Sequence, residues 1–401
     1  MKRVPEDETL MDASLLENAT VDLVVRGFIR DWDAMEDLLR HVLYTGLGWE
    51  IGNEGQVLFT DPLSTPKAVR EQLVQLMFEK FNISGFYASE QAVLSLYAVG
   101  SISGCTVDVG HGKMDISSVI EGVVQHISSR RFEIGGLDLT NLFAQELGKS
   151  NPHVNLSISD VEKLKERFAC CAEDDVAYRK VLQACPEEQH TLPDGQVIKI
   201  GRERYTVGEA LFEPSILGME AHGIVEQLVH YISTVSTENH RQLLENTVLC
   251  GGTASLPDVG SSDLMYRAAC HAPRVDTSHT KANSIPLTCS DFSACHTPRV
   301  DAQTKANSMP LTCSNFSACQ PPRFDAQTKV LKIGFRRKLT FPQPFGLVLS
   351  RPPDYMPDNL GSYSAWVGGA IPAKVVFPQN QHVTRADYDE TGPSIVHRKC
   401  F

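Results

Sequence analysis

The segment 104–136 constrains the fold of this 401-residue chain most, because it holds two short strand patterns on either side of a glycine turn. Residues 105–109 and 114–120 are rich in β-branched side chains, and Gly-His-Gly stands at 110–112. Two such strands joined by a tight turn form a β-hairpin. Glycine on both sides of His111 predicts positive φ angles that turn backbone N–H groups toward one point. Such a nest suits an anion, typically a phosphate.

Two further residue patterns are compatible with a phosphate site. Asp108 comes just before the turn, where a carboxylate could hold a metal-bound water beside the phosphate. Residues 247–250 form a buried-strand pattern that runs into Gly-Gly-Thr, where the backbone could approach a phosphate or a base closely. The simpler interpretation of the strand–turn–strand pattern around 110–112 is a structural hairpin without a ligand, because glycine turns are common.

Charge, hydropathy and cysteine content limit the partners and the cellular compartment that the chain can be expected to have. The chain carries 49 acidic and 37 basic residues and a formal net charge of −12, so its surface should repel nucleic acid. A role at DNA would therefore need a partner. No apolar run approaches the roughly 18 residues that span a bilayer, and the N-terminal residues lack the apolar core of a signal peptide. The 11 cysteines show no paired framework, which predicts a reducing compartment.

Residues 259–345 contain a tandem repeat. HAPRVDTSHTKANSIPLTCSDFSAC is followed by HTPRVDAQTKANSMPLTCSNFSAC and by the fragment QPPRFDAQTK. The copies have no helical or strand period and bury little apolar surface, which predicts a disordered insertion. A zinc site is the alternative, although the cysteine spacing is unusual for one. Its candidate ligands are His271, Cys289, Cys295, His296, Cys313 and Cys319.

Three predicted helices carry further candidates. Gln91 lies in the first turn of a helix that ends near Gly100. Lys165 and Glu166 lie on a helix that the pair Ser159 and Glu162 is expected to cap, and the simplest interpretation is that they are solvated charges. Residues 363–371 form an apolar helix with a glycine pair, which allows close packing.

Six of these stretches together resemble the actin family. They are DWDAMEDLL, KAVREQLVQLMFE, FYASEQAVLSLYAVG, NTVLCGGT, YSAWVGGAI and DYDETGPSIVHRKCF, in the order and spacing expected. The resemblance covers residues 21–258 and 346–401. Four others are similar to a plant nuclear class of actin-related proteins: FTDPLSTPKAVREQL, GHGKMDI, HTLPDGQVIKIGRERY and FPQNQHVT.

The resemblance implies an α/β, actin-like fold of the actin/Hsp70/hexokinase ATPase superfamily, with two lobes around a cleft. It further implies that the chain is N-terminally incomplete, because residues 1–20 supply neither the family's opening strands nor its first phosphate loop. The expected parts are a disordered N-terminus (1–20), a partial first lobe (21–98), a second-lobe base (99–134), a fourth subdomain (135–221), a third subdomain (222–258), the repeat insertion (259–345), a return to the third subdomain (346–364) and a C-terminal return to the first lobe (365–401).

The resemblance also implies a site for ATP with Mg²⁺ in that cleft. By the family's motifs, the phosphate loop is Asp108, Gly110, His111 and Gly112, with Asp108 serving the metal. The nucleotide-facing residues are Gly251, Gly252 and Thr253, the adenosine side is Lys165 and Glu166, and Gln91 orients the attacking water. Two departures argue against hydrolysis: His111 stands where conventional actin has aspartate, and Asp115 where it has histidine. No catalytic residue is therefore predicted.

The function implied is that of a non-catalytic subunit of a nuclear ATP-dependent chromatin remodelling complex of the SWI/SNF kind, acting in gene expression and development. Its partners would be a helical segment of the motor subunit, held in an apolar groove near Tyr97 and Tyr363, and other actins or actin-related proteins. Neither nucleic acid nor membrane would be contacted directly. The expected location is the nucleus, with the cytoplasm as the alternative. The alternative functions are an ATP-hydrolysing, filament-forming cytoskeletal protein and a defective product of an aberrant transcript.

Overall fold

Two β-sheets organise the part of the chain that the structure, a computed structural model, describes: residues 23–172, 175–256 and 360–400. Strands β11 (Thr247–Cys250), β5 (Gly104–Val109), β6 (Met114–Ile120) and β7 (Val123–Val124) follow one another in the larger sheet, and β8 (Arg130–Phe132) also pairs with β6. The smaller sheet has the order β12 (Val383–Thr384), β4 (Gly85–Glu90) and β3 (Gln56–Asp61). The predicted α/β class is thus confirmed.

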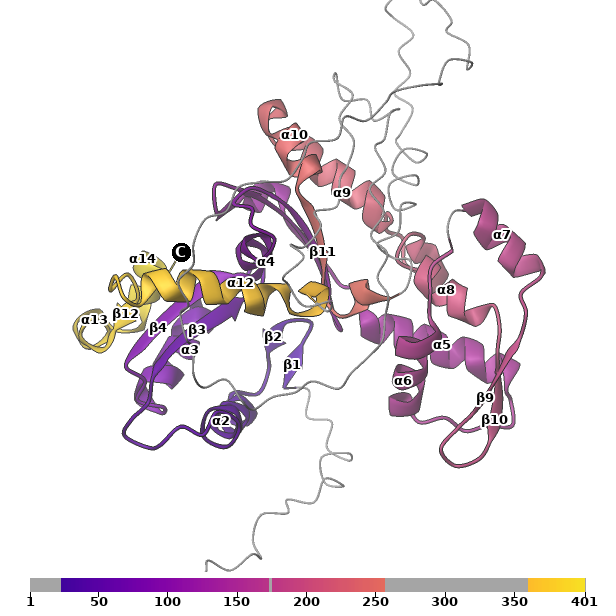
Figure 1. Cartoon of the computed structure of the whole chain (residues 1–401), viewed down its shortest axis with the longest axis horizontal. Helices are drawn as coiled ribbons and strands as arrows, with labels where there is room; N and C mark the ends of the chain where they lie inside the picture. The colour runs from indigo at the N-terminus through magenta and orange to yellow at the C-terminus, as the bar shows by residue number, and fades with distance from the viewer. Residues whose placement is uncertain (1–22, 173–174, 257–359, 401) are drawn as a thin grey trace, which may run out of the picture. The chain divides into compact units, whose positions relative to one another are not determined.

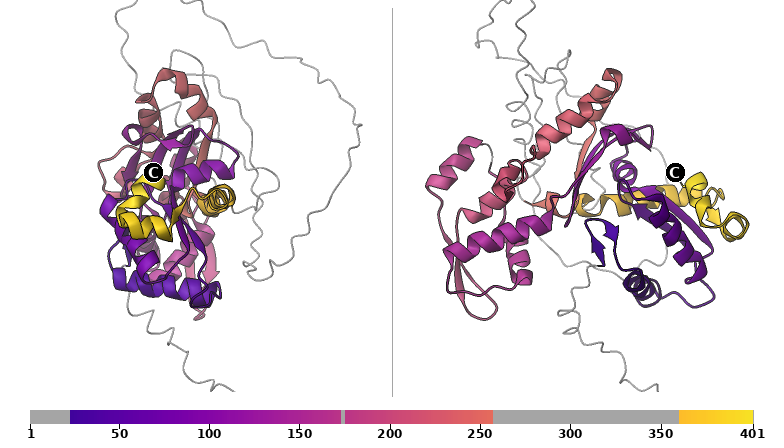
Figure 2. Two further views of the ribbon diagram at one scale, coloured as in Figure 1. Left: turned by 90° about the vertical axis from the view of Figure 1, so that its left-hand side faces the viewer. Right: turned by 180° about the vertical axis from the view of Figure 1, so that it is seen from behind.

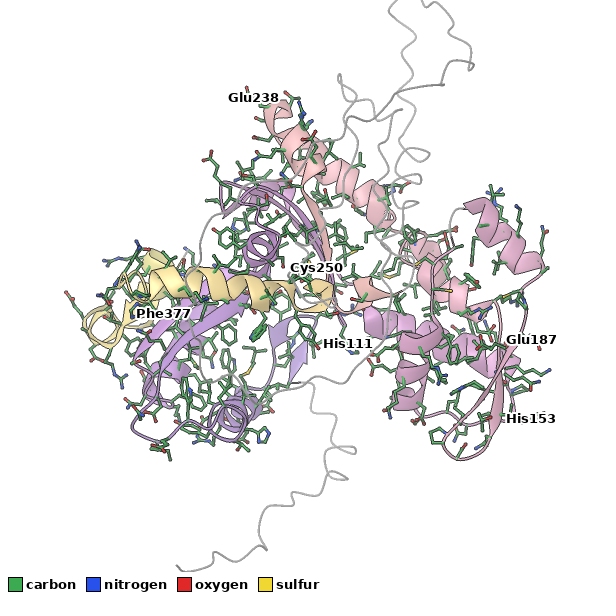
Figure 3. The ribbon with its side chains drawn as sticks, in the orientation of Figure 1. His111, His153, Glu187, Glu238, Cys250 and Phe377 are labelled. Carbon is green, nitrogen blue, oxygen red and sulfur yellow. The ribbon has the colours of Figure 1, made fainter. Side chains whose placement is uncertain are left out.

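The predicted hairpin is present as β5 and β6, which pair antiparallel with Asp108 opposite Asp115. Strand β11 runs parallel to β5 and sets Cys250 beside Asp108. The end of β11 and the β5–β6 turn therefore meet at one edge of the sheet, where His111 and Cys250 are labelled in Figure 3. The sequence motifs on these two segments are brought together by this parallel pairing.

Helices surround both sheets (Figure 1). Those before β5 are α2 (Trp32–Arg40), the π-helical turn η1 (His41–Gly46), α3 (Lys67–Glu79) and α4 (Gln91–Ala98). Those between β6 and β11 are η2 (His126–Ser128), α5 (Gly136–Ser150), α6 (Ile158–Phe168), α7 (Asp175–Gln183), α8 (Glu203–Glu209), η3 (Pro214–Leu217), α9 (Ile224–Ser233) and α10 (Thr237–Glu245). The last are η4 (Thr253–Ser255), α12 (Leu360–Val376), α13 (Arg385–Thr391), η5 (Pro393–Ile395) and α14 (Val396–Lys399).

Two small hairpins complete the described elements. Strands β1 (Val24–Val25) and β2 (Phe28–Ile29) pair antiparallel, as do β9 (Glu188–Thr191) and β10 (Val197–Ile200). No helix in the described part of the chain is both long and apolar enough to cross a membrane.

The buried apolar side chains fall into separate clusters. One cluster runs from Cys105 to Leu256 and joins the larger sheet to α5, α6 and α8–α10. A second joins η1, α3 and the smaller sheet to the C-terminal helices, from Leu43 to Cys400. A third, smaller cluster lies where α4 meets the larger sheet and includes Leu96 and Val248. Each sheet therefore has its own core, with α4 between them.

Helix α12 packs on α4 at very short range, as the expected glycine pair allows. A Cβ atom on Gly368 would come 1.7 Å from the carbonyl oxygen of Leu94, and one on Gly369 would come 3.2 Å from Leu58. Figure 1 and the right-hand view of Figure 2 show α12, in yellow, running beside α4 and the smaller sheet. Tyr363 interrupts α12 with a non-helical φ of −123°, at the residue where the sequence placed the start of the apolar helix, and the helix also extends before it to Leu360.

Several local predictions need correction. The N-cap of α6 is Ser157, which accepts from the N–H of Asp160, and not Ser159, because the same Ser-to-acid spacing occurs two residues earlier. Gly110 and Gly112 do not adopt positive φ. Gly112 is instead confined by Arg26, whose Cα would lie 3.3 Å from an added Cβ. The N-terminus, the repeat insertion and the candidate zinc ligands lie outside the described residues.

Candidate functional site

The predicted phosphate turn is held in place by its own carbonyl groups. The carbonyl oxygen of Gly110 accepts from the N–H of Gly136, 2.9 Å away, and from Thr253 Oγ1 at 2.9 Å. The carbonyl oxygen of His111 accepts from the N–H of Leu137 at 2.7 Å. The turn is thus tied to the first turn of α5 and to the segment after β11, so two of the predicted site segments meet beside α5.

Glycine is required around this turn because backbones approach closely there. A Cβ on Gly251, which has a φ of +95°, would come 2.5 Å from Asp108 Oδ1 and 2.3 Å from the carbonyl oxygen of Val109. A Cβ on Gly136 would come 2.6 Å from Thr253 Oγ1. Gly252, by contrast, is exposed and has no atom within 4 Å of an added Cβ. Gly251 and Thr253 therefore adjoin Asp108 and the turn, whereas Gly252 faces outward.

Asp108 and Asp115 form a cross-strand carboxylate pair. Two cationic side chains are paired with Asp115. Arg131 Nε lies 2.9 Å from Asp115 Oδ1, and Lys113 Nζ is paired with Asp115 Oδ2. Burial raises the pKa of the Asp108 carboxyl, which the neighbouring Lys113 ammonium partly opposes. Lys113 and Arg131 were missed from the sequence, where they stand 18 residues apart, since only the pairing of β6 with β8 brings them together.

Gln91 reaches the same place from the first residue of α4. It lines a small cavity of about 10 Å³ together with Asp108, Asp115, Thr106 and Cys250. A cavity of that size holds about one water molecule. The structure therefore places Gln91 and Asp108 around a single water-sized space, although the predicted roles of both residues stay predictions.

The two predicted adenosine-side residues differ in environment. Lys165 is only 5% exposed and donates to the carbonyl oxygen of Gly136 at 3.0 Å and to Thr140 Oγ1 at 2.7 Å. Burial lowers the pKa of its ammonium group. Glu166 is exposed. The solvated-charge interpretation therefore holds for Glu166 and is wrong for Lys165, which fastens α6 to α5 directly beside the phosphate turn.

Arg26 covers the turn from the β1–β2 hairpin. Its guanidinium donates to the carbonyl oxygens of Gly112 at 3.1 Å and Glu133 at 2.6 Å and forms an ion pair of 3.2 Å with Asp138. Arg26 has a φ of +49°, a left-handed conformation that is costly for a residue with a side chain. This strain is offset by the hydrogen bonds to the turn. Sequence reasoning missed Arg26, which no local motif marks.

The site residues fit a nucleotide better than a free metal ion. No group of three or more His, Cys, Asp or Glu side chains in the described residues could hold a metal. Mg²⁺ usually binds one or two carboxylates plus substrate phosphates. Asp108 could supply one such carboxylate, since Asp115 is already paired with two cations. A metal here would therefore arrive with the phosphates of its nucleotide.

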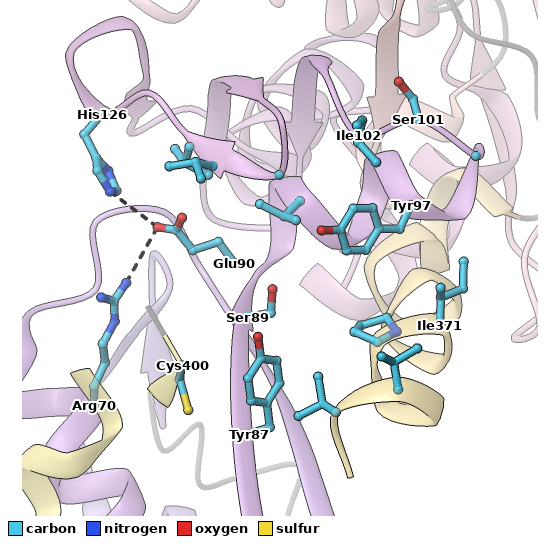
Figure 4. Close-up of a pocket in the computed structure, with 18 residues that line it drawn as sticks. Arg70, Tyr87, Ser89, Glu90, Tyr97, Ser101, Ile102, His126, Ile371 and Cys400 are labelled. Carbon is cyan, nitrogen blue, oxygen red and sulfur yellow. Dashed lines mark ion pairs between the residues drawn. The ribbon is translucent and has the colours of Figure 1, made fainter. Parts of the chain in front are cut away.

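A much larger pocket lies between α4 and α12, with a volume of about 740 Å³ (Figure 4). We call it the α4–α12 groove. Four of its lining residues are apolar and largely exposed: Ile102 (59%), Val123 (62%), Ile371 (47%) and Val375 (46%). Tyr97 also lines the groove, as expected, but Tyr363 does not.

The opposite end of the groove is polar, and sequence reasoning missed it. Glu90 lies there between Arg70 and His126, as Figure 4 shows. Glu90 Oε1 is 3.7 Å from Arg70 Nη2 and 3.8 Å from His126 Nε2, and it is buried without a hydrogen bond. Burial raises the pKa of this carboxyl. The only local signal was a glutamate at the N-cap of α4, where its side chain makes no capping bond.

Comparison with known proteins places these features in one family. The family model described as Actin matches residues 12–161, 159–261 and 358–401. The chain is 60% identical to Actin-related protein 7 of Arabidopsis thaliana over its full length and 92% of that protein's length. It is 56% identical to Actin-related protein 7 of Oryza sativa subsp. japonica over its full length and 91% of that protein. Centractin of Saccharomyces cerevisiae is 34% identical over 59% of the chain and 63% of the relative.

The plant class predicted from the sequence motifs is thus confirmed, and so is the actin-like fold. The residues that match the family model leave residues 262–357 uncovered, and this interval contains nearly all of the predicted repeat insertion. Together with the hairpin, the Gly-Gly-Thr segment and the packing of α12 on α4, these matches show that the chain belongs to the actin family.

Proposed function

We propose that the chain is a non-catalytic subunit of a nuclear ATP-dependent chromatin remodelling complex of the SWI/SNF kind, and that it binds a helical segment of the motor subunit. The observation that carries this proposal is the α4–α12 groove. Its volume of about 740 Å³ and its exposed apolar rim match the way an amphipathic helix inserts side chains at helical spacing into a groove. Exposed apolar surface of this kind is typical of an interaction site.

The charge of the chain supports an indirect role at chromatin. A net charge of −12 disfavours contact with nucleic acid, so the motor subunit would supply the DNA binding. Other actins or actin-related proteins are further proposed partners. The proposed location is the nucleus, and the role is control of gene expression in development.

The phosphate turn is proposed to bind ATP with Mg²⁺ as a structural ligand. Asp108 would hold the metal through water, and His111 in place of an acidic side chain argues against turnover. When bound, the nucleotide would supply the phosphate charges that complete the metal's ligand set. The residues of this chain would orient it: Gly251 by close backbone approach, and Thr253 by fixing the turn through Gly110.

An affinity purification tests the proposal. The tagged chain would be expressed in plant cells and purified from nuclei, beside the variants Ile371→Asp, in the groove, and Ile158→Asp, on the exposed face of α6. Wild type and Ile158→Asp should retain a SWI/SNF-type motor ATPase, whereas Ile371→Asp should lose it while keeping its thermal transition. Retention of the motor by Ile371→Asp, or its absence from all three, would contradict the proposal.

A second candidate, an ATP-hydrolysing and filament-forming actin, is favoured by one observation. Gln91 and Asp108 line the same water-sized cavity, which is where a water-orienting amide and a metal-linked carboxylate would be needed. Phosphate release from the purified chain with magnesium and ATP distinguishes the two. Sustained turnover that Gln91→Ala abolishes would support the second candidate, and no turnover supports the first.

A further inference from the structure

Glu90 has an unusual position for a carboxylate that serves only the fold. It is the N-cap residue of α4, yet its side chain accepts no hydrogen bond from the first turn of that helix. Glutamate is a poor N-cap compared with serine, threonine, aspartate or asparagine. The side chain instead extends to the polar end of the α4–α12 groove. Capping therefore does not explain a glutamate here.

The nearest cations do not satisfy Oε1 of this carboxylate. Both lie 3.7–3.8 Å from Oε1, which is within ion-pair range but too far for a hydrogen bond. Arg70 is already engaged with Asp61, through its Nε at 2.7 Å and its Nη2 at 2.6 Å from Oδ2. A buried acceptor without a donor bears its full desolvation cost, and a donor brought by a ligand would remove it.

The local charge favours a cationic donor over a neutral one. Two carboxylates, Asp61 and Glu90, face one guanidinium, that of Arg70. His126 is 62% exposed on its side chain and carries charge only when protonated. With His126 neutral, the cluster therefore holds one negative charge in excess at the end of an apolar groove. A Lys or Arg side chain complements that excess, and a planar guanidinium could also donate two hydrogen bonds.

We propose that Glu90 binds a Lys or Arg side chain of the partner helix, and thereby selects helices that carry a basic residue at one end of an apolar stripe. The apolar stripe would lie on Ile102, Val123, Ile371 and Val375, and the basic side chain would extend along Tyr87 and Ser89 to Glu90. This inference rests on the proposed helical partner. It also fixes the orientation of the bound helix, because the basic residue must lie at the end of the groove where Glu90 is.

A display selection tests the inference without knowledge of the natural partner. The probe is a phage-displayed library of helices of about 18 residues, or five turns, varied at surface positions. The library is selected in parallel on wild type, on the isosteric variant Glu90→Gln, and on Glu220→Gln, an exposed control. A peptide from the wild-type pool and its analogue with norleucine in place of the basic residue are then measured by titration.

The wild-type and Glu220→Gln pools should share an apolar stripe and a Lys or Arg at one fixed position beside it. The Glu90→Gln pool should keep the stripe and lose the basic position. The peptide should bind Glu90→Gln about tenfold or more weakly, and the norleucine analogue should not distinguish the two proteins. If the Glu90→Gln pool is as rich in Lys or Arg at that position as the wild-type pool, the inference is wrong, although the groove can still be a helix-binding site. If no selected peptide loses its binding on Ile371→Asp, the groove does not bind helices, and both the proposed function and this inference fail.

Discussion

Gly368 of α12 lies so close to Leu94 of α4 that a Cβ atom would come within 1.7 Å of the Leu94 carbonyl oxygen. This contact sets the distance between the two helices, and their separation defines the α4–α12 groove. Glu90 immediately precedes α4 and lines both the groove and the water-sized cavity beside Asp108. A change in this packing should therefore affect both places.

Replacing Gly368 with alanine tests this packing. The added methyl cannot fit against the Leu94 backbone, so α12 must move, and we expect a loss of roughly 1–3 kcal/mol or more in the free energy of unfolding. Gly148→Ala is the matched control, since no atom lies within 4 Å of an added Cβ and the position is inside α5. The control should gain about 0.5–1 kcal/mol from helix propensity. Urea denaturation measures both, and equal effects would refute the close contact.

The cross-strand carboxylates predict opposite responses to the same substitution. Asp115→Asn would leave the mostly buried cations Lys113 and Arg131 without their shared partner, at a cost of about 3–5 kcal/mol. Asp108→Asn would relieve the like-charge pairing across β5 and β6, so the free energy of unfolding should stay level or rise by roughly 0.2–1 kcal/mol. Chemical denaturation of the two variants compares them directly. A larger loss for Asp108→Asn than for Asp115→Asn would contradict the charge arrangement.

Arg26 should fix the β1–β2 hairpin on the phosphate turn. Arg26→Gly relieves the left-handed strain but removes the guanidinium, so the loss in the free energy of unfolding should be at most about 1.5–3 kcal/mol, the range for hydrogen bonds to charged groups. Hydrogen exchange at residues 24–29 and 110–113 should accelerate together. Arg202→Gly, at an exposed residue in another part of the chain, serves as the control for loss of an arginine. Unchanged exchange in the Arg26 variant would show that the hairpin is held by other contacts.

The C-terminal helices carry an acid-sensitive interaction. Hydrogen bonds from Lys399 and Thr384 lower the pKa of Asp387 to about 2, from its usual 3.8. Because the folded pKa is the lower one, the stabilisation is complete above pH 4 and disappears as the pH falls toward 2. Asp387→Asn should therefore be destabilised at pH 6 and approach wild type only as the pH falls to about 2. Asp389→Asn, exposed on the same helix, is the control, and a pH-independent difference for Asp387→Asn would contradict this reasoning.

Local patterns predicted the elements that local chemistry determines. Runs rich in β-branched residues on either side of 110–112 predicted β5 and β6, whereas the spacing that predicted a cap at Ser159 was wrong by two residues. The positive φ angles expected of Gly110 and Gly112 were wrong for a physical reason. Gly112 is confined by Arg26, and a Cβ on Gly135 would come 2.5 Å from the carbonyl oxygen of His111. Both contacts join distant segments, and sequence spacing carries no information on such approaches.

The polar end of the groove could not be predicted at all. Arg70 comes from α3, Glu90 from the end of β4, and His126 from the segment before β8. Each residue alone is an ordinary surface charge in the sequence. Lys165 was misjudged for a related reason: its partners on α5 stand 25 and 29 residues earlier, so its burial depends on packing of α6 against α5. The motifs predicted the hairpin turn and the Gly-Gly-Thr segment, and tertiary packing determined the charges around them.

The most direct measurement of the central claim is site-specific photo-crosslinking inside the purified nuclear complex. A benzophenone amino acid would replace Val375, which lines the α4–α12 groove, and in a second protein Val176, exposed on α7. The account predicts that the probe at position 375 crosslinks to a helical segment of the motor subunit, with apolar residues at helical spacing, and that the probe at 176 does not. A motor subunit that crosslinks from position 176 and not from position 375 would contradict the account.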